Sequence, residues 1–164
     1  MEAKSTDKKT FKLLDNDQQT GEIIYENLLF LKAEIHITDA EKYKIEPVGF
    51  FGTSISITRD ETPVASLYLS WNGQIVIMFQ NGQEYILRLN NMFSNKYILE
   101  NKDGEKLVQL ESKFSWRAFH YRYDISYGLD QNKRPADTLL LLLAVYSANF
   151  FIATMSGANA GMMA

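Results

Sequence analysis

The sequence predicts a mainly β protein, a closed antiparallel barrel of about 11 to 12 strands around a buried hydrophobic C-terminal helix. Three observations support this fold. Short runs of alternating apolar and polar residues recur about every 8 to 12 positions, as in antiparallel sheets. Asn-Gly and Asp-Gly pairs, which favour tight turns, separate several of these runs. No charged residue occurs from residue 138 to residue 164, and this segment is long enough for a helix.

Eleven segments combine the alternation with the β-branched and aromatic residues that favour strands. In chain order they lie near residues 10–15, 21–26, 31–38, 42–48, 53–59, 63–71, 74–80, 83–89, 95–101, 105–112 and 116–127.

Three dipeptides mark tight turns between these strands. They are Asn72-Gly73, Asn81-Gly82 and Asp103-Gly104, and each stands between two alternating runs. Asn, Asp and Gly tolerate positive φ, so we expect type I′ turns at the two Asn-Gly pairs. Residues 63–112 are therefore predicted to form a continuous meander.

The two ends of the chain differ sharply in polarity. Residues 1–10 contain no apolar run, so they are predicted to be a flexible polar tail that precedes a single domain of residues 11–164. Near the other end, a helix is predicted over about 138–156, with Asp137 as its N-cap and Gly157 as its stop. This helix is apolar on every side, so either protein or lipid must surround it.

Two interpretations of the C-terminal helix remain open. In the first, a barrel of this size has a lumen that its own side chains cannot fill, and the helix fills it. In the second, residues 139–155 span a bilayer and make the chain a tail-anchored membrane protein. Ser147 and Asn149 lie at the centre of that span, where an amide without a partner is costly, so the buried helix is favoured.

Composition excludes several classes of protein. The net charge of −3 argues against binding to nucleic acid, because phosphate contacts need a strongly basic surface. The chain contains no cysteine, which excludes thiol catalysis and zinc–thiolate sites and is consistent with a cytoplasmic protein. No motif for a catalytic residue, a metal or a cofactor occurs, and the two histidines, His36 and His120, are too few for a histidine metal centre.

The most unusual polar segment is KFSWRAFHYRYDISY, residues 113–127, in which cations alternate with aromatic rings. Residues 113–134 contain five Lys or Arg against two Asp, a net charge of +3 in an otherwise acidic chain. Such a segment can bind lipid headgroups, with candidate contacts at Lys113, Trp116, Arg117 and Arg122. The alternative is an ordinary half-buried strand that turns Phe119, Tyr121, Tyr123 and Ile125 to the core.

The hairpin YILENKDGEKLVQLES and the terminal PADTLLLLLAVYSA, with its Asp137-Thr138-Leu139-Leu140 helix start, resemble the tubby C-terminal-like superfamily. That superfamily includes tubby proteins, phospholipid scramblases and LURP-one-related proteins. The resemblance runs from about Phe11 onward and implies a barrel of about twelve strands around a hydrophobic C-terminal helix. It also implies a function at membranes, although no phosphoinositide-binding residue can be transferred position by position.

These observations together predict a non-enzymatic binding module in the cytoplasm that can lie peripherally at a membrane. The expected partner is an anionic lipid headgroup, a phosphoinositide or another, or else a second protein. The alternative is the tail-anchored protein. The oligomeric state does not follow from the sequence.

Overall fold

A computed structural model of the chain describes residues 1–27, 30–49, 54–91, 93–115, 120–128 and 137–155. In this part of the chain there are twelve strands and one helix. They are β1 (Glu2–Ser5), β2 (Thr10–Asp15), β3 (Gln18–Tyr25), β4 (Ala33–His36), β5 (Lys42–Val48), β6 (Ser54–Arg59), β7 (Thr62–Leu69), β8 (Ile75–Phe79), β9 (Glu84–Leu89), β10 (Lys96–Asn101), β11 (Lys106–Ser115), β12 (His120–Tyr127) and α1 (Thr138–Met155).

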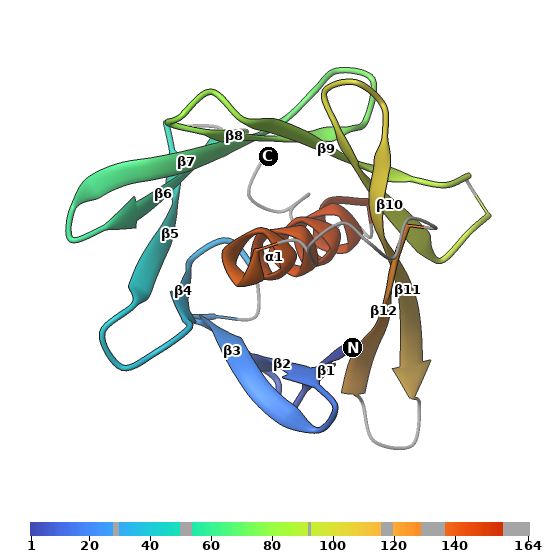
Figure 1. The fold of residues 1–164 in the computed structure, drawn as a ribbon, viewed down its shortest axis with the longest axis horizontal. Helices are drawn as coiled ribbons and strands as arrows, with labels where there is room; N and C mark the ends of the chain where they lie inside the picture. The colour runs from blue at the N-terminus through green and yellow to red at the C-terminus, as the bar shows by residue number, and fades with distance from the viewer. Residues whose placement is uncertain (28–29, 50–53, 92, 116–119, 129–136, 156–164) are drawn as a thin grey trace.

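The strands form one closed barrel in which each strand is antiparallel to its neighbours in the chain. The barrel closes where β1 pairs with β12, with Ala3 opposite Tyr123. Helix α1 runs through the interior, enclosed by the ring of strands (Figure 1). The predicted mainly β barrel around a buried apolar helix is therefore confirmed.

The prediction of a flexible tail over residues 1–10 was wrong. Residues 2–5 form β1, and Thr10 already belongs to β2. The Ser5 hydroxyl donates to the Tyr121 carbonyl oxygen at 3.1 Å, and the Tyr121 N–H donates back to the Ser5 hydroxyl at 3.0 Å. The sequence EAKS gives no apolar signal, but without this strand β2 and β12 would both be left with unpaired edges.

The turns confirm the hairpins but correct their type. At Asn72-Gly73 only Gly73 has positive φ (79°), and its N–H donates to the Ser70 carbonyl. Gly82 and Gly104 have the same arrangement, so these are three-residue turns ending in a left-handed glycine, not type I′ turns. Consecutive positive φ values occur instead at Asn16-Asp17 and Asp60-Glu61, where β2 meets β3 and β6 meets β7.

The helix is buried along nearly its whole length. It begins at Thr138 and ends at Met155, close to the predicted 138–156, and the Asp137 carbonyl accepts its first hydrogen bond from Leu141. It is long and apolar enough to cross a membrane by length and composition, yet 72% of it is buried inside the barrel. The inward residues of the strands and the buried residues of the helix form one hydrophobic core.

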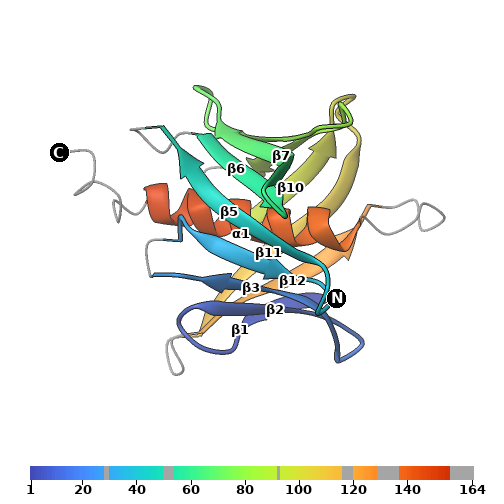
Figure 2. The ribbon, with the colours of Figure 1, turned by 90° about the vertical axis from the view of Figure 1, so that its left-hand side faces the viewer.

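The helix defines two ends of the barrel, because its axis runs from one opening to the other (Figure 2). We call them the Thr138 end and the Met155 end. Successive strands alternate in direction, so the odd-numbered strands finish at the Met155 end and the even-numbered strands finish at the Thr138 end. The connections therefore also alternate between the two ends.

Gly21 in β3 allows the closest approach between sheet and helix. A methyl group at this position would lie 2.9 Å from Cδ1 of Leu142 and 3.2 Å from the His36 carbonyl oxygen. Both values are shorter than ordinary van der Waals contact. A side chain here would therefore push α1 away from β3.

We expect Gly21→Ala to destabilise the barrel by about 1–3 kcal/mol, because overpacking forces the helix or the strand to shift. The free energy of unfolding is measured by urea titration. In a Leu142→Ala background the same substitution should cost less, since the clashing methyl group is gone. An equal cost in both backgrounds would contradict this account of Gly21.

Candidate functional site

Two of the four predicted lipid contacts lie in the described part of the chain. Lys113 and Arg122 are directly opposite each other in the pairing of β11 with β12. Both point outward, and the side chain of each is 47% exposed. Trp116 and Arg117 lie outside the described residues.

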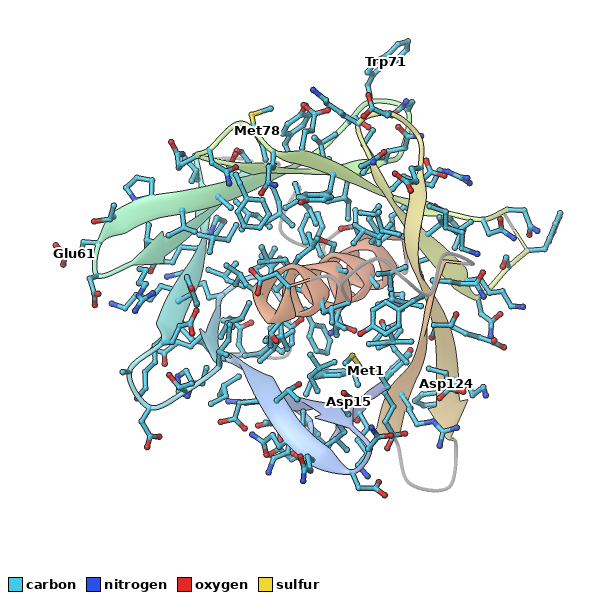
Figure 3. All side chains as sticks on the ribbon, viewed as in Figure 1. Met1, Asp15, Glu61, Trp71, Met78 and Asp124 are labelled. Carbon is cyan, nitrogen blue, oxygen red and sulfur yellow. The ribbon has the colours of Figure 1, made fainter. Side chains whose placement is uncertain are left out.

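Both cations are paired with acidic side chains. The Lys113 ammonium group contacts Asp124 Oδ2, and Arg122 Nε lies 3.0 Å from Asp124 Oδ1 and 3.8 Å from Glu2 Oε2. The hydrogen bond from Lys113, with the nearby charge of Arg122, holds the pKa of Asp124 below its usual value. Asp124 lies on the outer wall of the barrel (Figure 3). The predicted site is therefore a mixed-charge surface.

The barrel register extends this surface into a row of four cations by adding Lys4 and Lys12, which the sequence did not single out. Lys12 pairs with Lys4, Lys4 with Arg122, and Arg122 with Lys113, across four adjacent strands. We call these four residues the basic row. Lys12 is half-buried and the other three are exposed. Residues 110 positions apart come together here, so no local pattern in the sequence could have revealed the row.

The basic row lies toward the Met155 end of the barrel. Lys4 precedes the last residue of β1, which finishes at that end, and Arg122 is near the start of β12, which begins there. The next row toward the Thr138 end contains Glu2, Asp124 and Glu111, which are also consecutive partners. Charge on this wall therefore changes sign along the barrel axis.

The turns continue this separation of charge. Among the described residues, the connections at the Thr138 end carry eight carboxylates against one lysine, Lys102, a net charge of −7. The eight are Asp17, Asp39, Glu41, Asp60, Glu61, Asp103, Glu105 and Asp137. At the Met155 end the described connections carry three lysines against two carboxylates, a net charge of +1. Among the described residues, the Thr138-end connections are therefore strongly acidic, whereas those at the Met155 end are close to neutral.

The described residues of the predicted inward face of β12 turn toward the core, as the alternative interpretation predicted. Tyr123 is 0% exposed, Ile125 is 6% exposed and Tyr121 is half-buried, whereas Phe119 lies outside the described residues. The Tyr123 hydroxyl donates to Asn149 Oδ1 at 2.8 Å. Asn149 Nδ2 in turn donates to the Tyr25 hydroxyl at 2.9 Å. These rings face the helix and are not available to a ligand on the outer wall.

The buried tyrosines form the only cluster of perturbed ionisable groups inside the described part of the barrel. Burial raises the pKa of Tyr25, Tyr123 and Tyr146, and it raises the pKa of Tyr97 to about 12. The hydroxyls of Tyr25 and Tyr123 bond to Asn149, and the Tyr146 hydroxyl donates to the Leu31 carbonyl at 2.6 Å. The cluster satisfies the polar atoms of α1, and this is a structural role.

The remaining chemical candidates are weak. His36 Nε2 lies 2.9 Å from Glu34 Oε2, and its Nδ1 lies 3.8 Å from Glu22 Oε1, in a surface cluster on β3 and β4. No group of three or more His, Asp or Glu side chains that could hold a metal occurs among the described residues. At the Thr138 end, a shallow open groove lies between the β8–β9 and β10–β11 turns. A substrate site requires a more enclosed pocket with convergent polar groups.

No protein-family model matches the chain, and no curated protein or solved structure matches it either. The resemblance to the tubby C-terminal-like superfamily therefore stays a prediction. The functional proposal therefore rests on the fold and on the distribution of charge.

We expect Asn149→Leu to lower the free energy of unfolding by about 2–4 kcal/mol, because two buried tyrosine hydroxyls lose their partner. Adding Tyr25→Phe and Tyr123→Phe should recover most of this loss, since both sides of each hydrogen bond are then apolar. Urea unfolding followed by circular dichroism measures both. A triple variant less stable than Asn149→Leu would contradict the network.

Stability should also fall steeply above pH 10. The buried tyrosines have raised pKa values in the folded state, whereas unfolded tyrosines ionise near pH 10. Below about pH 10 both states keep their protons; above it the unfolded state binds fewer protons and is favoured. Urea unfolding at several pH values measures this slope. Tyr97→Phe should make it shallower, whereas Tyr68→Phe on the outer wall serves as the control.

Proposed function

We propose that this protein is a non-enzymatic module that binds reversibly to the cytoplasmic face of an anionic membrane through phospholipid headgroups. The observation that carries the proposal is the basic row, Lys12, Lys4, Arg122 and Lys113, aligned across four strands. A row of cations across four strands of one wall suits a surface of many phosphates better than one small ligand.

The ion pairs within the row do not prevent this binding. Exposed pairs such as Lys113 with Asp124 contribute only about 0–1 kcal/mol to stability, so exchanging a carboxylate for a lipid phosphate costs little. Each cation near an anionic membrane surface contributes about 1 kcal/mol at low salt. The row can therefore supply a few kcal/mol of binding free energy, which makes an attachment that is weak and reversible.

The polarity of the whole molecule supports a membrane surface. A flat bilayer meets only one side of the barrel, so the net charge of −7 on the described residues of the Thr138-end connections can face away from it. The predicted relationship to the tubby C-terminal-like superfamily, whose functions centre on membranes, agrees with this proposal. The interior is filled by α1 and its tyrosine network, so the outer wall remains for binding.

The expected result is that the protein co-sediments with vesicles of phosphatidylcholine containing about 30 mol% phosphatidylserine at low salt. Binding should fall as NaCl rises to about 0.5 M, because salt screens the attraction. A triple variant, Lys4→Gln, Lys12→Gln and Arg122→Gln, should bind at least about tenfold more weakly.

The matched control is Lys42→Gln, Lys102→Gln and Lys106→Gln. It removes the same three charges from exposed lysines toward the Thr138 end and should bind like the wild type. Equal losses in the two triple variants would show that net charge alone matters. Absence of wild-type binding at low salt would overturn the proposal.

A further inference from the structure

Two aromatic side chains at the Met155 end are completely exposed. Trp71, in the β7–β8 turn, has a relative exposure of 101%, and Phe93, in the β9–β10 connection, has 99%. Trp71 projects from the tip of its hairpin, away from the rest of the molecule (Figure 3). Both connections join an odd-numbered strand to the next even-numbered strand, so both lie at the same end of the barrel.

The turns themselves do not require these rings. Trp71 is the first residue of the three-residue turn that ends in the left-handed Gly73. The same position holds Gln80 and Lys102 in the turns that end in Gly82 and Gly104. A polar residue therefore satisfies this geometry. In the β9–β10 connection, the Phe93 N–H donates to Asn91 Oδ1 at 3.1 Å. This bond uses the backbone of Phe93 and does not involve its phenyl ring.

Further apolar side chains accompany them. Val48, at the last residue of β5, is 51% exposed, and Met155, at the end of the helix, is 73% exposed. Tyr68, the second-last residue of β7, is 39% exposed, so five of the seven exposed large hydrophobic residues in the described part of the chain lie at or toward the Met155 end. Single exposed apolar residues are ordinary, but a group gathered at one end of a barrel indicates a contact surface.

The basic row lies next to these aromatic residues around the circumference of the barrel. Around the barrel, β10 follows the Phe93 connection, and next come β11, β12, β1 and β2, the strands of the row. The Met155 end thus presents aromatic tips over one part of its circumference and cations over the adjoining part. Aromatic rings beside Lys and Arg suit the headgroup region of an anionic bilayer, where rings insert and cations meet phosphates.

We propose that the barrel docks with its Met155 end on an anionic membrane, with Trp71 and Phe93 inserted among the headgroups as anchors. This inference rests on the proposed function and adds the orientation and the anchoring residues. The acidic connections of the Thr138 end then face the cytoplasm, because the anionic surface repels them. The indole suits this position, since its ring is apolar and its N–H can reach water or a phosphate.

Orientation is tested with a polarity-sensitive label at each end. The chain contains no cysteine, so Trp71→Cys and Lys102→Cys each give a single site for a nitrobenzoxadiazole label. The two positions are equivalent in their turns but lie at opposite ends. On phosphatidylserine-containing vesicles, the label at 71 should shift its emission to the blue and the label at 102 should not. Equal shifts at both positions would overturn the orientation.

Anchoring is tested with Trp71→Gln plus Phe93→Ser, which should weaken binding to the same vesicles about tenfold or more. The matched control is Met78→Ser plus Tyr127→Gln, which removes two exposed apolar side chains toward the Thr138 end. It should bind like the wild type. Circular dichroism checks that both variants are folded.

The outcomes separate this inference from the proposed function. If the Trp71 and Phe93 variant binds like the wild type while the basic-row variant does not, charge-driven binding stands and the anchors are wrong. If the wild type shows no salt-sensitive binding, the proposed function fails first. If light scattering shows a dimer that this aromatic variant dissociates, the rings serve contact with a second copy, and the membrane orientation is overturned.

Discussion

Enclosure of an uncharged helix is the constraint on which the rest of this structure depends. Helix α1 carries no charge and no polar face, so every side of it must be removed from water. Twelve strands close around it, and Gly21 lets β3 approach Leu142 closely. The three buried polar side chains of the helix have hydrogen-bond partners: Ser147 bonds to the Leu143 carbonyl, Asn149 to two tyrosines, and Tyr146 to the Leu31 carbonyl.

Because α1 fills the lumen, the proposed function uses the outer surface of the barrel. Lipid carriers built on barrels use the interior for their ligand, but here the helix and its aromatic neighbours occupy that volume. Closure of the barrel also determines which charged residues meet on its outer surface. Because β1 joins β12, cations from the two ends of the chain meet in the basic row, and the alternating connections place the carboxylates and the exposed rings at opposite ends.

Local patterns determined the fold class but could not locate the surface. The alternation along β5 to β10 and the uncharged stretch after Asp137 carry their own physical signals, the periods of strand and helix, so these elements were predictable. Lys113 and Arg122 were singled out because an aromatic segment surrounds them, yet their neighbours Asp124 and Glu2, and the partners Lys4 and Lys12, depend on register between distant strands.

The sequence by itself determined that an apolar helix follows a series of short antiparallel strands and that protein or lipid must cover it. Tertiary structure decided which of the two covers it, because only closure of the barrel encloses α1. It also decided that EAKS is a strand. The residues of EAKS have no strand pattern of their own, but the edges of β2 and β12 provide hydrogen-bond partners on both sides. Both outcomes depend on pairing between strands that are far apart in the sequence, which no short segment of the sequence reveals.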